Sequence, residues 1–142
     1  MKKILLATII ASGFAATALA ASNPAKDRQL LMKNVGAAVG VGGKMAKGEM
    51  EFNAAAAQLV LKTFNAGAHG FGYLFPEGSE TGEETEAAPA IWSDRAGFDA
   101  AIAKFAADTT GTVTDLDSFK AEFGKATANC GSCHKAFRIK KQ

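Results

Sequence analysis

The stretch that decides the fold is residues 116–137, LDSFKAEFGKATANCGSCHKAF, near the C-terminal end of the 142-residue chain. Its apolar residues and cysteines recur at alternating spacings of three and four, which places them on one face of a helix. This face holds Leu116, Phe119, Phe123, Ala126, Cys130, Cys133 and Phe137. A pattern of this kind over three heptads is typical of a helix packed in a bundle, so these residues are predicted to form one such helix.

Three stretches upstream also have helical periodicity. The first is expected to run from the N-cap Asn23 to about Gly48. The second is expected to follow Asn53 and to dissolve in a glycine-rich segment at Gly67, Gly70 and Gly72. The third is expected to have Ser93 as its N-cap and to break at Gly111. Glycines inside the first helix indicate that a neighbouring backbone or a bulky group approaches it closely.

The composition agrees with a packed helical protein. Hydrophobic residues make up 48% of the chain and charged residues 21%, with three prolines, which excludes disordered, collagen-like and disulfide-dense classes. No segment has the strict alternation of a strand. Short links between amphipathic helices bring neighbours together antiparallel, so we predict an all-α fold, an antiparallel four-helix bundle.

Residues 1–20 have the pattern of a cleaved signal peptide. Lys2 and Lys3 precede an uncharged apolar stretch that closes on the small-x-small pattern Ala18-Leu19-Ala20. A membrane anchor would need ~20 apolar residues with stop-transfer flanks, and this run is shorter. No second long apolar run follows. We therefore expect a periplasmic bundle domain over residues 21–142, with no membrane span.

The charge balance changes when the signal peptide is removed. The full chain has 16 Lys and Arg against 14 Asp and Glu. Loss of Lys2 and Lys3 leaves 14 of each, and the formal charge becomes zero. Nucleic-acid binding requires a cationic surplus or patch, so no nucleic-acid partner is predicted.

Both cysteines of the chain lie in one motif, Cys130-Gly131-Ser132-Cys133-His134. C-x-x-C-H is the pattern of c-type haem attachment. Two thiols on one helical turn can both reach the vinyl groups along one edge of a porphyrin, and the adjacent histidine can bind the iron. Because both cysteines lie on the face toward the bundle, the haem is expected to insert between helices. The sequence predicts one covalent haem c, with His134 as an axial ligand of its iron.

Other interpretations of the cysteine pair fit less well. A thioredoxin-type redox disulfide belongs near a βαβ pattern, which is absent. A zinc site needs four ligands, and outside the motif the chain offers His69 and scattered carboxylates. A structural disulfide between residues three apart on one helix would constrain almost nothing. An exported bundle without haem, with an incidental motif, is the remaining alternative.

Three segments resemble the class II c-type cytochromes, the family that includes cytochrome c′. They are CGSCHKAFR at residues 130–138, PAIWSD at residues 89–94 and RQLLM at residues 28–32. The motif alone is generic, but its place near the end of an all-helical chain is specific. The resemblance covers essentially the whole chain after the signal peptide. It implies a left-twisted four-helix bundle with haem c on the fourth helix, and a homodimer as a common form.

The resemblance also implies residues around the haem. A low-spin branch of the family uses a first-helix methionine as the sixth iron ligand, and the matching position is Met32. In cytochrome c′ itself a bulky apolar residue blocks that side and the iron is five-coordinate. A helix methionine also commonly fills a gap in a core, so both interpretations of Met32 stay open. Arg28 matches a basic residue that approaches a haem propionate, and its alternative is an exposed cation at the helix start. Gln29 belongs to the same pocket, and Arg138 is expected at the haem edge, at the propionates or at the negative end of the helix.

The segment between the second and third helices combines aromatic and acidic residues. Phe71, Tyr73 and Phe75 are expected to cap the bundle at the haem end, and the resemblance implies that Trp92 anchors the third helix in the core. The acidic run within residues 76–89 is expected to be a solvated loop.

These features predict a periplasmic mono-haem cytochrome that carries single electrons and is not an enzyme. His/Met ligation would raise its reduction potential. Its partners would be redox proteins of a respiratory or photosynthetic chain, steered by cations at the end of the last helix, Lys135, Arg138, Lys140 and Lys141. The competing function is binding of nitric oxide or carbon monoxide, which requires that Met32 leaves the iron open.

Overall fold

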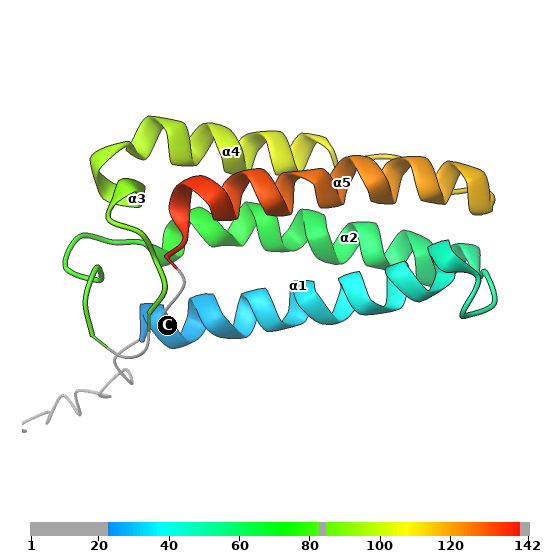
Figure 1. Cartoon of the computed structure of the whole chain (residues 1–142), viewed down its shortest axis with the longest axis horizontal. Helices are drawn as coiled ribbons and strands as arrows, with labels where there is room; N and C mark the ends of the chain where they lie inside the picture. The colour runs from blue at the N-terminus through cyan, green and yellow to red at the C-terminus, as the bar shows by residue number, and fades with distance from the viewer. Residues whose placement is uncertain (1–22, 83–84, 140–142) are drawn as a thin grey trace, which may run out of the picture.

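The computed structural model describes residues 23–82 and 85–139, and the predicted signal peptide lies outside them. Over these ranges four long helices run up, down, up and down in an antiparallel bundle (Figure 1): α1 (Pro24–Lys47), α2 (Ala54–Phe71), α4 (Arg95–Ala107) and α5 (Leu116–Phe137). A 3₁₀ turn, η1 (Gly72–Leu74), and a short helix, α3 (Ala90–Ser93), lie between α2 and α4. The described residues contain one isolated β-bridge and no strand. The predicted all-α four-helix bundle is confirmed.

The helix starts follow the predicted capping in two cases. The side chain of Asn23 accepts a hydrogen bond from the backbone N–H of Lys26 at 3.1 Å, and that of Asn53 accepts one from Ala56 at 2.9 Å. At α5, Asp115 is the N-cap and forms a reciprocal capping box with Ser118.

Over the described residues, no helix combines the length and the apolar character needed to cross a membrane.

The predicted start of the third helix is wrong by one residue. Ser93 ends the short helix α3, and Asp94 is the N-cap of α4, with its carboxylate accepting a hydrogen bond from Gly97 N at 3.1 Å. Pro89 starts a separate helical turn, and the backbone of Asp94 (φ −125°, ψ 58°) breaks the helix between the two. The carboxylate of Asp94 therefore caps the positive end of α4, where the hydroxyl of Ser93 was expected to do so.

The second helix ends within the glycine-rich segment, as expected, with Gly72 as its C-cap. α2 continues through Gly67 and Gly70 to Phe71. A Cβ at Gly67 would lie 2.9 Å from Cγ2 of Val35 on α1 and 3.5 Å from Cδ2 of Leu31. The glycine therefore marks a close approach of α1 to α2, and the contact outweighs its low helix propensity.

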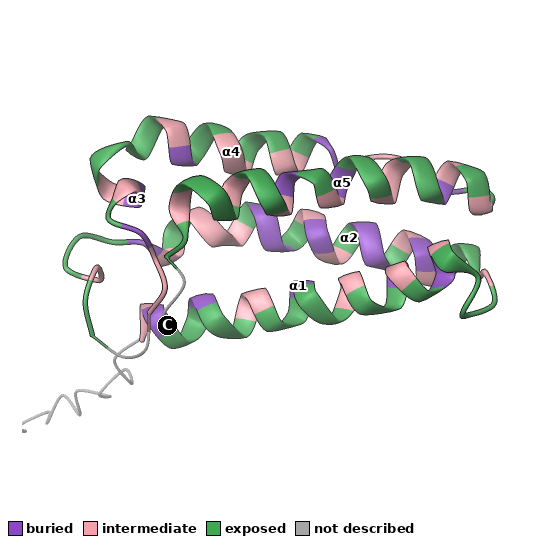
Figure 2. Ribbon diagram, in the orientation of Figure 1, coloured by how far each residue is buried: buried purple, intermediate pink, exposed green. Residues whose placement is uncertain are grey.

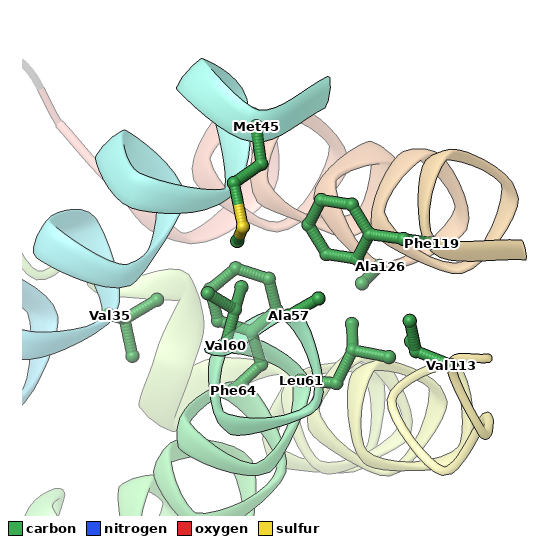
Figure 3. Close-up of a cluster of buried hydrophobic side chains, with 9 residues drawn as sticks. All are labelled: Val35, Met45, Ala57, Val60, Leu61, Phe64, Val113, Phe119 and Ala126. Carbon is green, nitrogen blue, oxygen red and sulfur yellow. The ribbon is translucent and has the colours of Figure 1, made fainter. Parts of the chain in front are cut away.

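The apolar interior consists of two clusters of buried side chains. The first cluster brings together buried side chains of α1, α2, α5 and the link between α4 and α5 (Figure 3): Val35, Met45, Ala57, Val60, Leu61, Phe64, Val113, Phe119 and Ala126. The second cluster lies at the end where α2 ends and α4 begins: Phe75, Ile91 and Phe98, with Phe71, Trp92 and Phe137 packed against it. Figure 2 shows buried residues concentrated along α2 and the outer side of α1 exposed. Tyr73 is 87% exposed, so it does not cap the bundle as expected, whereas Phe71 and Phe75 do.

Helices α1 and α5 touch closely near Gly42. This residue is buried, and a Cβ there would collide with the ring of Phe123. The same test at Gly36, Gly40 and Gly43 finds no atom within 4 Å. The expectation of a close neighbour is therefore confirmed at Gly42, whereas no protein atom approaches the other three glycines.

Candidate haem-binding site

The cysteines of the motif lie on the inner face of α5 in its last two turns. Both thiols are half-buried, and they are not joined in a disulfide. Burial raises the pKa of Cys130, and it raises that of Cys133, where the neighbouring Cys130 adds to the effect. Reactive thioredoxin-type thiols have a lowered pKa. The raised pKa values keep the pair mainly protonated at neutral pH, which disfavours thiol–disulfide exchange.

The motif histidine lies on the outer side of the same turn. His134 is exposed and lines a shallow, open concavity with Gly131, Lys135 and Arg138. Partial burial lowers the pKa of its imidazole, the charge of Arg138 lowers it further, and Glu86 opposes both. A lowered pKa favours the neutral imidazole, which is the form that binds a metal ion.

Along α5, the haem-binding motif lies between the two apolar clusters. On α5, Ala126 belongs to the first cluster and Phe137 packs against the second, and the two cysteines between them belong to neither. No group of three or more His, Cys, Asp or Glu side chains in the described chain could hold a metal ion alone, so a zinc site lacks its ligands there. Two thiols one helical turn apart, followed directly by an imidazole, can bond to the two vinyl groups of a haem and supply one ligand to its iron, so the residues fit haem c.

The predicted sixth ligand lies on the inner side of α1. Met32 is half-buried and packs against the first cluster. The other methionines of the described chain differ from it: Met45 is fully buried within that cluster, and Met50 is 40% exposed beyond the end of α1. Met32 is the methionine that combines partial burial with a place near the start of α1, on the side of the bundle where α5 ends.

Arg28 is 5% exposed, so its interpretation as an exposed helix-start cation is wrong. Its Nη1 donates to Leu74 O at 2.9 Å and to Ser79 Oγ at 3.1 Å, and its Nη2 donates to Ser79 O at 3.0 Å and Thr85 Oγ1 at 3.3 Å. The guanidinium also lies 4.7 Å from the ring centroid of Phe75. Four of its five N–H groups thus bind the segment after α2, and only Nε–H has no partner recorded in the described chain.

The other predicted pocket residues lie at the surface. Gln29 is exposed on α1, next to Arg28 in sequence. Arg138 follows the end of α5, where its side chain forms an ion pair with Glu86. Sequence reasoning placed Glu86 in a solvated acidic loop and missed this pairing. The cations Lys140 and Lys141 lie outside the described residues.

A buried polar contact beside the motif was also missed. Asn129 is 6% exposed, and its Nδ2 donates to Oδ2 of Asp108 at 2.9 Å and to two backbone carbonyls of α5. Asp108, at the end of α4, also binds Lys104. The contact fixes the rotation of α5 against α4 one residue before Cys130. An asparagine in the middle of a helix, where its propensity is poor, was the available signal.

Comparison with known proteins gives a consistent result. The family model described as Cytochrome C′ matches residues 23–138. The chain is 39% identical to a cytochrome c′ of Rhodopseudomonas palustris, over 98% of this chain and 99% of that protein, and 34% identical to a cytochrome c-556 of Agrobacterium fabrum, over 98% and 97%. The solved structure of cytochrome c′ from Rhodopseudomonas palustris superposes with a TM-score of 0.80 at 39% identity, covering 85% of this chain and 99% of that one.

Proposed function

The chain belongs to the cytochrome c′ family, and we propose that it is an exported one-electron carrier with its haem iron between His134 and Met32. Proteins of this family hold one covalent haem c. Cys130 and Cys133 would hold it through thioether bonds, because they are the only cysteines of the chain. When bound, the haem supplies an iron that alternates between the ferric and ferrous states.

One observation carries this assignment. The two thiols of the motif are half-buried one helical turn apart on α5, directly before His134, and they lie between the two apolar clusters without belonging to either. Apolar side chains of the two clusters therefore lie on either side, along α5, of the site that a haem on these cysteines would occupy. The residues around it would keep water from the haem, hold its orientation and leave one edge near the surface at the end of α5.

The sixth ligand is supported by the position and chemistry of Met32. A thioether is a soft ligand that suits haem iron, and His/Met ligation raises the reduction potential. Met32 lies near the start of α1, half-buried toward the interior. One of the similar proteins is named as a cytochrome c-556 and another as a cytochrome c′, so the family likeness is compatible with either coordination.

Gas binding is the second candidate, and one observation favours it. Met32 packs against the first cluster, as a methionine that only fills a gap would. In that case the iron is five-coordinate, and its open side would accept nitric oxide or carbon monoxide.

Export and partners follow from the sequence and the surface. We propose that residues 1–20 are removed and that the mature protein works in the periplasm, as a monomer or homodimer. Its partners would be redox proteins of a respiratory or photosynthetic chain. Arg138 is paired with Glu86, whereas Lys135 forms no ion pair with the described residues and could steer an acidic partner from the concavity beside His134.

Absorbance spectra of the reduced protein, with and without carbon monoxide, test the proposal. We expect sharp, split low-spin bands that do not respond to the gas. Met32→Ala should give a broad high-spin spectrum that shifts with carbon monoxide, and Met50→Ala, at an exposed methionine, should match the unaltered protein. A gas-responsive spectrum of the unaltered protein would establish the second candidate instead, and a colourless protein would refute both.

A further inference from the structure

The C-terminal end of α5 is tied to the segment that precedes α3. Ala88 N donates to Phe137 O at 3.0 Å and Ile139 N donates to Glu86 O at 2.9 Å. Between these bonds, Ala87 and Arg138 form an antiparallel β-bridge. The two short segments therefore lie side by side, and the direction of the chain beyond the haem-binding motif is fixed.

A side-chain ion pair reinforces this backbone contact. Nε of Arg138 donates to Oε2 of Glu86 at 2.6 Å, and Nη2 of the same guanidinium contacts the same oxygen. The side chains are 43% and 35% exposed. Ion pairs with this exposure contribute little to stability, so the position of the pair matters more than its strength.

The pair lies beside the proposed iron ligand. Arg138 lines the concavity that also contains His134, and its backbone N–H donates to His134 O at 3.2 Å. Two opposite charges are thus held at the ligand's side of α5.

We infer that Glu86 is a positioning residue for the haem-binding end of α5: its carboxylate fixes the guanidinium of Arg138 beside His134, and the two opposite charges set the reduction potential of the iron. This inference rests on the proposed function, in which His134 binds the haem. The ferric state has one more positive charge than the ferrous state. A nearby carboxylate therefore favours the ferric state and lowers the potential, whereas a nearby guanidinium raises it.

Potentiometric titration of four holoprotein variants tests the inference. Glu86→Gln should raise the midpoint potential and Arg138→Gln should lower it. At a fixed applied potential, each should change the ferric-to-ferrous ratio at least threefold, which is about 28 mV at 59 mV per tenfold change. The midpoint potential of the double variant should differ from that of the unaltered protein by less than half of either single-variant shift. Asp99→Asn is the matched control, because Asp99 pairs with Arg95 at similar exposure on α4, and it should leave the potential unchanged.

Two further measurements separate an electrostatic role from a structural one. Arg138→Lys retains the charge and should shift the potential less than Arg138→Gln does. The shifts should also shrink when salt is raised from about 10 mM to about 500 mM, because the pair is half-exposed. The inference would be overturned if Glu86→Gln and Arg138→Gln shifted the midpoint potential in the same direction. It would also be overturned if neither shift exceeded that of Asp99→Asn. Both results would leave the haem assignment intact. An unaltered protein without haem bands would overturn the proposed function itself.

Discussion

Replacing Gly42 with alanine tests how closely α1 and α5 approach in the half of the bundle opposite the motif. A Cβ at this position would collide with the ring of Phe123, coming within 2.9 Å of Cδ2 and 3.1 Å of Cζ. The ring cannot swing aside freely, because it packs against Phe119 at 5.3 Å and Phe64 at 6.0 Å between centroids. The added methyl group must therefore push the helices apart or displace three aromatic rings.

The expected magnitude follows from two opposing effects. Alanine favours a helix over glycine by about 1 kcal/mol, and inserting a methyl group into a filled core costs about 1–3 kcal/mol. Gly40→Ala is the matched control in the same helix, because its Cβ would meet no atom within 4 Å. The control should be stabilised by up to about 1 kcal/mol, so Gly42→Ala should be about 1–3 kcal/mol less stable than the control. At about 4 °C per kcal/mol, this difference is about 4–12 °C in Tm.

Thermal and urea unfolding of both variants, at equal haem content, would measure the difference. Adding Phe123→Leu to Gly42→Ala should recover part of the loss if the ring is the obstacle. Equal stability of Gly42→Ala and Gly40→Ala would refute the close contact between α1 and α5, since the propensity gain is common to both.

Three other substitutions address the rest of the structure. Arg28→Met should destabilise the protein by about 2–4 kcal/mol and speed proteolysis of the segment after α2, because it removes four hydrogen bonds from a buried site; unchanged proteolysis would contradict this role. Hydrogen bonds from Lys104 and Asn129 lower the pKa of Asp108 below its ordinary 3.8, so its contribution is present above that pH and lost as the pH falls through the lowered value. In Asp108→Asn, the urea concentration at the unfolding midpoint should therefore fall less steeply below pH 4 than in the unaltered protein. An unchanged pH profile would count against the contact. Phe98→Ala should cost about 3–5 kcal/mol in urea unfolding, because its ring is 1% exposed at the centre of the second cluster; a cost below 1 kcal/mol would show that the cluster is loosely packed.

The helices and their caps were predictable because the signals are local. The spacing of apolar residues defined α5 over its full observed length, and Asn23 and Asn53 cap the helices that they precede. The boundary between Ser93 and Asp94 was missed because both residues are good caps. Choosing between them required knowing that Pro89 begins a separate turn.

The surroundings of the motif were less predictable, since they depend on contacts between residues far apart in the chain. Arg28 is buried by partners 46–57 residues away, and Glu86 meets Arg138 across 52 residues. Neither pairing leaves a periodic trace in the sequence. The motif itself was readable because its residues act together within one helical turn.

The division of the interior into two apolar clusters has a consequence for how the protein opens. The two clusters share no buried residue, so we expect the two ends of the bundle to open as separate cooperative units linked by the long helices. Amide hydrogens of η1, α3 and the start of α4 should exchange together, and sooner than those around Phe64 and Phe119. A cofactor bonded between the units would couple them, and its loss would free the aromatic end to unfold while the other half stays folded.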